Sequence, residues 1–241
     1  MPTTPQEIRD ATAAAYGIVS RCTQALRRLA ESAGYAVPCR RGCRMCCHFF
    51  IMVTFAEAVP IALWLASPKG GHRLEHFRER MKRIRDALGP EAAVLEDFLA
   101  RAVSLSPPGP DSSRYDEVAA AYRHLVCPFN ADDGSCQIYR LRPLQCRVHY
   151  VVGASEHCGL DAQRGPAVLR HPTLTQATEL ASGILRGVST EAGCLGSRLL
   201  PGAVEIALAW LRRCRPEAGY ALKPAPRTGR LRASWGRPGR L

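Results

Sequence analysis

The pattern of apolar and polar positions along the 241-residue chain predicts a series of helices. An amphipathic stretch covers residues 8–33 and ends at Gly34. Thr54 and Glu57 have the spacing of a capping box, in which each side chain satisfies a backbone amide at a helix start, so a second helix is expected to run to about Ala66. A third helix is predicted by apolar residues that recur at spacings of three and four, namely Leu74, Phe77, Met81, Ile84 and Leu88.

The rest of the chain adds to this helical pattern. Further helices are expected over residues 91–103, 115–126, 174–188 and 204–214, with a Pro-rich loop at 104–113. Residues 49–53, rich in aromatic and β-branched side chains, suggest a short strand. The predicted fold class is therefore mostly α, with at most short strands.

Cysteine is crowded into two short stretches of the chain. The first motif contains Cys39, Cys43, Cys46 and Cys47, and the second contains Cys127, Cys136 and Cys146, with Cys158 shortly after. Thiolates this close repel one another unless a cation neutralises them or they oxidise to disulfides. As metal ligands, such soft sulfur atoms favour zinc, an iron–sulfur cluster or copper(I) over magnesium or calcium.

Two local conformations of the first motif would bring its thiols together. On a helix, all four thiols would share one face. Alternatively, Gly42 permits a turn in which Cys43 and Cys46 form a chelating pair. The adjacent side chains of Cys46 and Cys47 are expected to diverge, so that they serve different metals or one of them only orients the site.

The second motif is expected to face the first across a shared site. Asp133-Gly134 marks a tight turn between Cys127 and Cys136. Arg142-Pro143 is expected to end any helix, with Cys146 following after a short rigid segment. Six arginines flank the thiols, namely Arg40, Arg41, Arg44, Arg140, Arg142 and Arg147. They would offset the negative charge of a metal–thiolate centre, or else they only contribute charge to the surface.

Composition and charge restrict the compartment and the partners. Charged residues make up 22% and apolar residues 46% of the chain, as in ordinary globular proteins. No apolar run approaches the roughly 20 residues that span a bilayer. No secretory signal is visible either, so we expect a cytoplasmic protein with reduced thiols. The odd total of 11 cysteines also fits a disulfide framework poorly.

The net charge of +12 is unevenly distributed. Residues 221–241 carry six basic side chains and no acidic one, together with several prolines and glycines, and are expected to be disordered. Such a tail is either a solvated end of the chain or a contact for nucleic acid or an acidic partner.

Together, the motifs resemble the YkgJ-type cysteine-cluster family over about residues 39–158. The resemblance rests on the Cys39–Cys47 offsets, on Val53-Thr54-x2-Glu57-Ala58, on Cys127-Pro-Phe, on Gly134-x-Cys136-x-Ile138-Tyr139 and on Arg142-Pro143-x2-Cys146-Arg147. That family is described as zinc- or iron-chelating, and its reaction is largely unassigned. The resemblance therefore implies metal binding by Cys39, Cys43, Cys46, Cys47, Cys127, Cys136 and Cys146, with Cys158 where relatives often have a further cysteine.

Other functions use similar residues. Cys39-x3-Cys43-x2-Cys46 has the spacing of radical S-adenosylmethionine enzymes, but the strand–helix alternation of their barrel is absent. The cluster also resembles that of flagellin lysine methylases, although no glycine-rich cofactor loop is found. A third class is a zinc-stabilised module that binds nucleic acid or protein through its basic surface, with a steep dependence on salt.

The remaining histidines and cysteines near these motifs have simpler interpretations. His48 and His149 flank motif cysteines. Each would act as a base, bind the metal as an occasional ligand, or contact the ligands without binding the metal. Cysteines in helical apolar contexts are expected to be buried small side chains, namely Cys22, Cys194 and Cys214.

The sequence thus predicts an irregular helical domain organised around a cysteine-ligated zinc or iron site, with the iron as ions or as an iron–sulfur cluster. Catalysis is left open, and the alternative is an iron–sulfur-containing, S-adenosylmethionine-dependent methyltransferase. The expected divisions are an N-terminal helix (1–38), the cysteine-cluster domain (39–160), C-terminal helices packed on the same domain (161–215) and a basic tail (216–241).

Overall fold

The computed structural model describes residues 4–39, 42–43, 45–48, 51–68, 71–92, 125–153 and 167–214. Several sequence predictions lie outside these ranges: nearly all of the helices expected at 91–103 and 115–126, the loop at 104–113, the basic tail, and Cys158. The end of the 115–126 prediction is described, and Leu125 and Val126 are not helical there. The division of the chain into domains stays a prediction.

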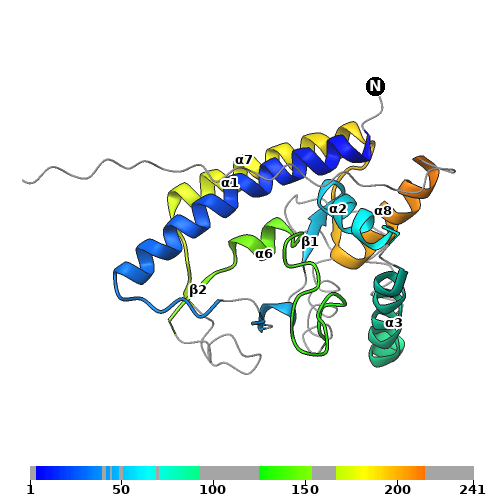
Figure 1. Ribbon diagram of the computed structural model, residues 1–241, viewed down its shortest axis with the longest axis horizontal. Helices are drawn as coiled ribbons and strands as arrows, with labels where there is room; N and C mark the ends of the chain where they lie inside the picture. The colour runs from blue at the N-terminus through cyan, green and yellow to red at the C-terminus, as the bar shows by residue number, and fades with distance from the viewer. Residues whose placement is uncertain are drawn as a thin grey trace, which may run out of the picture.

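The described part of the chain is mostly α-helical, as predicted. Helix α1 (Pro5–Ser32) and helix α7 (Pro172–Glu191) lie side by side along one edge of the molecule, and α2 (Phe55–Leu65) packs with α8 (Leu200–Cys214) (Figure 1). Helix α3 (Gly71–Leu88) and the short α6 (Leu144–Val148) complete the described α-helices. Among the described residues, no helix is long and apolar enough to cross a membrane.

Helix starts account for the main differences from the predicted boundaries. Helix α1 begins at Pro5, because Thr4 and Glu7 form a capping box there. Helix α8 begins at Leu200 rather than at 204, with Pro201 and Gly202 in its first turn. Proline is tolerated at that point, because the amide that it lacks has no intrahelical partner in the first turn.

Two short antiparallel pairs of strands join segments that are distant in the sequence. Strand β1 (Met52–Thr54) pairs with β4 (Ser197–Leu199), and β2 (Val151–Val152) pairs with β3 (Ala167–Val168). The strand expected near 49–53 is therefore present in part, at 52–54, while its partner was not predicted. Two or three residues carry too little periodicity to be recognised as a strand.

The core lies between the helix pairs and is built from the predicted apolar stripes. Ile61 of α2, Leu185 of α7 and Leu211 of α8 are almost completely buried, and the rings of Phe55 and Trp210 meet edge to face at 5.3 Å. All members of the α3 stripe after Leu74 are buried, as predicted. The core thus supports the segments that carry the cysteines.

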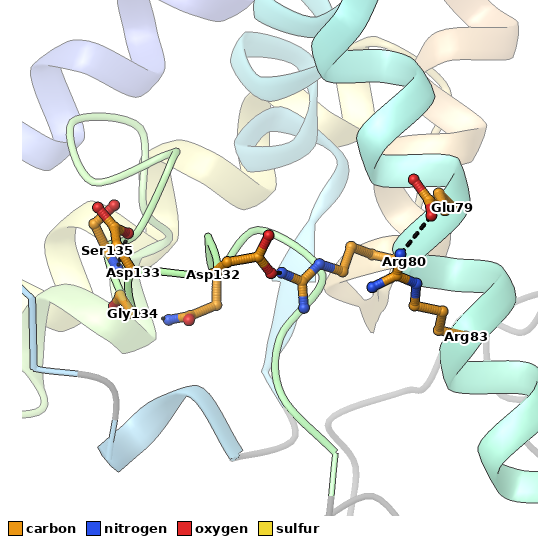
Figure 2. Close-up of polar contacts among 8 residues, drawn as sticks. Glu79, Arg80, Arg83, Asp132, Asp133, Gly134 and Ser135 are labelled. Carbon is orange, nitrogen blue, oxygen red and sulfur yellow. Dashed lines mark hydrogen bonds and ion pairs between the residues drawn. The ribbon is translucent and has the colours of Figure 1, made fainter.

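Helix α3 contacts the loop of the second cysteine motif in two ways. The rings of Phe77 and Phe129 stack with centroids 5.0 Å apart. Figure 2 shows the Arg80 side chain extending from α3 to the carboxylate of Asp132, with which it forms an ion pair. An apolar contact and a surface charge pair therefore hold this loop against the scaffold.

Candidate metal centre

Seven of the eight cysteines that were predicted to bind metal line one pocket, called here the thiol pocket. They are Cys39, Cys43, Cys46 and Cys47 of the first motif with Cys127, Cys136 and Cys146 of the second. Mostly apolar side chains form the rest of its wall, together with Arg142 and His149. The fold therefore brings the two motifs together, and the eighth cysteine, Cys158, lies outside the described residues.

The first motif enters the pocket through a turn and a short 3-10 helix. Gly42 has a φ of +89°, a left-handed conformation that favours glycine, and η1 (Met45–His48) carries Cys46 and Cys47. Of the two conformations that the sequence allowed, the described residues favour the turn. The Val151 amide donates a hydrogen bond to Cys39 Sγ at 3.2 Å, so this thiol is held by a strand of the later segment.

The adjacent thiols Cys46 and Cys47 converge, which corrects the expectation that they diverge. The two side chains hydrogen-bond to each other. A 3-10 turn is tighter than an α-helical turn, and η1 places both residues in one such turn. Both sulfur atoms can therefore face the same pocket.

The second motif is a compact loop pinned directly to the first. The Cys127 amide donates to the Cys47 carbonyl at 2.8 Å. Asn130, which is 3% exposed, donates from Nδ2 to Cys47 Sγ at 3.4 Å and to the Gly134 carbonyl at 3.2 Å. Gly134 has a φ of +81°, which confirms the predicted tight turn. Sequence analysis missed Asn130, because no local pattern marks a side chain that joins two distant motifs.

Backbone amides of the second motif point at its thiols. The Phe129 amide donates to the Cys127 sulfur, and the Ile138 amide donates to the Cys136 sulfur, in each case from two residues further along the chain. Amide donors stabilise a thiolate relative to a thiol and orient it toward a metal. This arrangement suits a cysteine that serves as a metal ligand.

Cys146 lies in helix α6, which was not predicted, because only a short rigid segment was expected after Arg142-Pro143. Pro143 instead occupies the N-cap of α6. A proline at a helix start interrupts no internal hydrogen bond. The Leu144 amide at the start of α6 donates to Glu57 Oε1 at 2.7 Å. Glu57 therefore caps both α2 and α6, whereas the capping box in the sequence predicted only its role at α2.

Burial is the main influence on the pKa of four pocket thiols, namely Cys39, Cys127, Cys136 and Cys146. Burial raises the pKa of Cys127 and of Cys39, and it raises the pKa of Cys146 to about 12. A hydrogen bond with Cys47, followed by burial, raises the pKa of Cys46. Neighbouring thiols add to each increase, because clustered thiolates repel one another. These thiols would therefore remain protonated at neutral pH unless a bound cation compensates their charge.

Among the flanking arginines that the structure describes, Arg142 is the one that lines the thiol pocket. Its guanidinium lies 4.0 Å from the Tyr139 ring centroid, and its charge acts on Cys46, Cys136 and Cys146. Its Nε is buried without a hydrogen-bond partner. Arg140 is exposed, and Arg40, Arg41 and Arg44 lie outside the described residues.

Arg147 is turned mainly toward the scaffold. Its guanidinium stacks 4.0 Å from the Tyr16 ring centroid and donates to Ser20 and to the carbonyls of Arg140 and Arg142. Burial lowers its pKa, although the neighbouring Tyr16 and Cys146 oppose this effect. Arg147 therefore joins the loop before α6 to helix α1.

The donor set of the pocket fits zinc or iron. Within the described residues, no three Cys, His, Asp or Glu groups are already arranged to hold an ion. The fit therefore rests on donor chemistry: clustered soft sulfurs, amide donors to thiols and a nearby guanidinium. His149 also lines the pocket, and burial lowers its pKa, so that its imidazole is neutral at pH 7.

The other described cysteines stand apart from the thiol pocket. Cys22 on α1 is partly buried. Cys194 is also partly buried, but it follows the end of α7 rather than lying in a helix. Cys214 was predicted to be a buried small side chain, but it is exposed. It is the last residue of α8, where the helix has left the packed face.

Comparison with known families agrees with this picture. Residues 38–164, just over half of the chain, match the CxxCxxCC family, described as "Putative zinc- or iron-chelating domain". The chain belongs to this family, with which the YkgJ-type resemblance is consistent. No curated protein and no solved structure matches the chain significantly. The comparisons lend no support to the methyltransferase alternative, which stays a prediction.

Proposed function

We propose that the protein binds zinc or iron through the seven cysteines of the thiol pocket and that the ion joins the two cysteine motifs. The observation that carries this proposal is the shared pocket, lined by thiols from both motifs. A bound dipositive ion would relieve the repulsion between clustered thiolates and lower their pKa values. His149 and Cys158 are the further candidate ligands.

The ion would supply a cross-link between segments that have little regular structure. The first motif contributes a turn and η1, and the second contributes a loop and the five-residue α6. Because such short elements bury little apolar surface, a metal that ties them together would contribute directly to folding. We propose this structural role first, with no reaction attached to it.

Reduced thiols are a condition of this function. Metal ligation needs thiolates rather than disulfides, so a reducing compartment such as the cytoplasm suits the protein. All of the described cysteines are free thiols. Partners of the basic tail, including nucleic acid, stay predictions, because the tail lies outside the described residues.

The test is the metal content of the full-length protein purified without oxygen. Elemental analysis should find zinc or iron, and a visible spectrum with an assay for acid-labile sulfide should distinguish single ions from an iron–sulfur cluster. The double variant Cys43→Ser/Cys136→Ser removes one thiol from each motif and should lose its metal and melt at a lower temperature.

The matched control is Cys22→Ser/Cys214→Ser, which removes two thiols outside the pocket and should keep both its metal and its melting temperature. Unchanged metal content in Cys43→Ser/Cys136→Ser would rule out a site shared by the two motifs.

A further inference from the structure

The thiol pocket contains more sulfur ligands than one tetrahedral ion can use. Zinc at a structural site takes four ligands, whereas seven thiols line the pocket. Two four-coordinate ions that share one ligand need seven. The number of thiols therefore matches a pair of ions joined by a bridging sulfur, if one of the seven lies between the two motifs.

Cys46 occupies that intermediate position. Within the first motif, a hydrogen bond with Cys47 raises the pKa of Cys46. Cys46 and Cys43 both raise the pKa of Cys39. In the second motif, Cys46 acts electrostatically on each of the three thiols, Cys127, Cys136 and Cys146. All seven thiols line the same pocket, and Cys46 is within electrostatic reach of thiols in both motifs.

Contacts of the neighbouring Cys47 place the short helix η1, which also carries Cys46, at the seam between the motifs. Cys47 accepts the Cys127 amide at its carbonyl, at 2.8 Å, and the Asn130 side chain at its sulfur, at 3.4 Å. Both contacts fasten η1 to the second-motif loop. Cys46, the residue before Cys47 in η1, is therefore held beside that loop although it belongs to the first motif.

Charge compensation is available at the same point. Arg142 acts on Cys46 and on two second-motif thiols, and its buried Nε is without a partner in the described structure. Seven thiolates around two dipositive ions keep a net negative charge, which a guanidinium donor would offset.

We propose that the thiol pocket binds two metal ions with Cys46 as their bridging ligand. The first ion lies among Cys39, Cys43, Cys46 and Cys47, and the second lies among Cys46, Cys127, Cys136 and Cys146. This inference rests on the proposed function and adds to it the number of ions and their division between the motifs.

The decisive measurement is the metal stoichiometry of the full-length wild-type protein. Metal-free, reduced protein is titrated with Zn²⁺, and the complex is weighed by native mass spectrometry. Two ions per chain without sulfide are expected. A single ion would overturn the inference but leave the proposed metal binding intact. Absence of any bound ion would contradict both.

The bridge itself is tested in wild-type protein loaded with ¹¹³Cd²⁺. Two cadmium signals split by mutual coupling are expected, because the shared sulfur connects the two nuclei. Two unsplit signals would mean separate sites and would overturn the bridging role of Cys46. This measurement needs no variant and so does not depend on whether a variant folds.

Single substitutions then locate the two ions. Cys43→Ser and Cys127→Ser should each keep one tightly bound ion, whereas Cys46→Ser should weaken the binding of both ions by at least about tenfold. Cys214→Ser is the control and should keep both. If Cys46→Ser, shown to be folded by its circular dichroism, keeps one ion as tightly as Cys43→Ser does, Cys46 is not the bridge.

Discussion

The helical scaffold and the cysteine segments of this protein are held together by different interactions. Helices α1 and α7 are long, and they are packed through fully buried apolar residues such as Val19 and Leu185. The cysteine motifs form short elements joined by hydrogen bonds between distant residues, such as those from Leu144 to Glu57 and from Asn130 to Cys47. The scaffold should therefore fold independently of metal, whereas the site should need it.

The largest expected loss of stability comes from a substitution in the scaffold, away from the cysteine motifs. Leu185 is 1% exposed, so Leu185→Ala should lower the free energy of unfolding by about 3 kcal/mol through lost burial and a cavity. The loss should be the same with and without metal when measured by urea denaturation. Leu180, 58% exposed on the same helix, is the control, and Leu180→Ala should cost less than about 0.5 kcal/mol. A loss at Leu185 that disappears in metal-free protein would mean that the two regions do not fold separately.

A smaller effect is expected at Glu57, which joins the scaffold to the site. Glu57→Gln keeps the shape of the side chain, but it places an amide group against donors that need acceptors, so it should lower the free energy of unfolding by about 2 kcal/mol. The control is Glu7→Gln in the exposed capping box of α1, where water can replace the lost acceptor and the loss should be clearly smaller. Equal losses at the two positions would show that the contact of Glu57 with α6 adds nothing.

Glu57 also gives the stability a pH dependence, whose sign follows from its burial. Burial raises the pKa of Glu57 above its ordinary value of 4.5, despite hydrogen bonds that lower it. The folded protein then holds this proton at pH values where the unfolded chain has lost it. The Glu57 contribution to stability therefore falls as the pH rises from 4.5 through the raised pKa. The stability difference between wild type and Glu57→Gln should decrease over that range, and an increase would contradict the assignment.

Arg142 should affect the site with little effect on the scaffold. Arg142→Met should raise the metal dissociation constant by about tenfold, because a hydrogen-bond donor near the ligands is lost. The dissociation constant of Arg142→Lys should lie between those of Arg142→Met and the wild type. The unfolding of metal-free protein should change less, because the Arg142 Nε has no hydrogen-bond partner in the described structure and a Met side chain can keep the contact with the Tyr139 ring. The exposed Arg140, substituted by Met, is the control. If the metal-free protein is destabilised as much as the loaded one, Arg142 is a packing residue only.

The smallest effect is expected at the Arg80–Asp132 pair between α3 and the second-motif loop (Figure 2). Asp132 is 84% exposed, so Asp132→Ala should cost about 0.5 kcal/mol, and the cost should vanish at about 1 M salt. Glu79→Ala, which removes a charge pair within α3, is the control. A loss several times larger that resists salt would show that the ion pair, rather than the Phe77–Phe129 stack, attaches the loop.

Much of the scaffold could be predicted, because its signals are local. The three- and four-residue spacing from Phe77 to Leu88 predicts the buried face of α3, and Thr54 with Glu57 predicts the start of α2. The cysteine spacing is likewise a local signal, and it predicts a soft-metal site. Strand β4 and helix α6 were missed, since the short β4 lacks a periodic signal and Pro143 was interpreted as an end rather than a start.

By itself, the sequence determined the long described helices of the scaffold and which thiols are candidates for one site, because helix periodicity and cysteine spacing act over a few residues. The tertiary structure alone decided that the two motifs meet and that Glu57 caps two helices. It also decided that Asn130, 83 positions from Cys47, reaches that thiol. Such contacts depend on how the buried scaffold places distant backbone groups, and the amides and carboxylates left inside must then find partners across the chain.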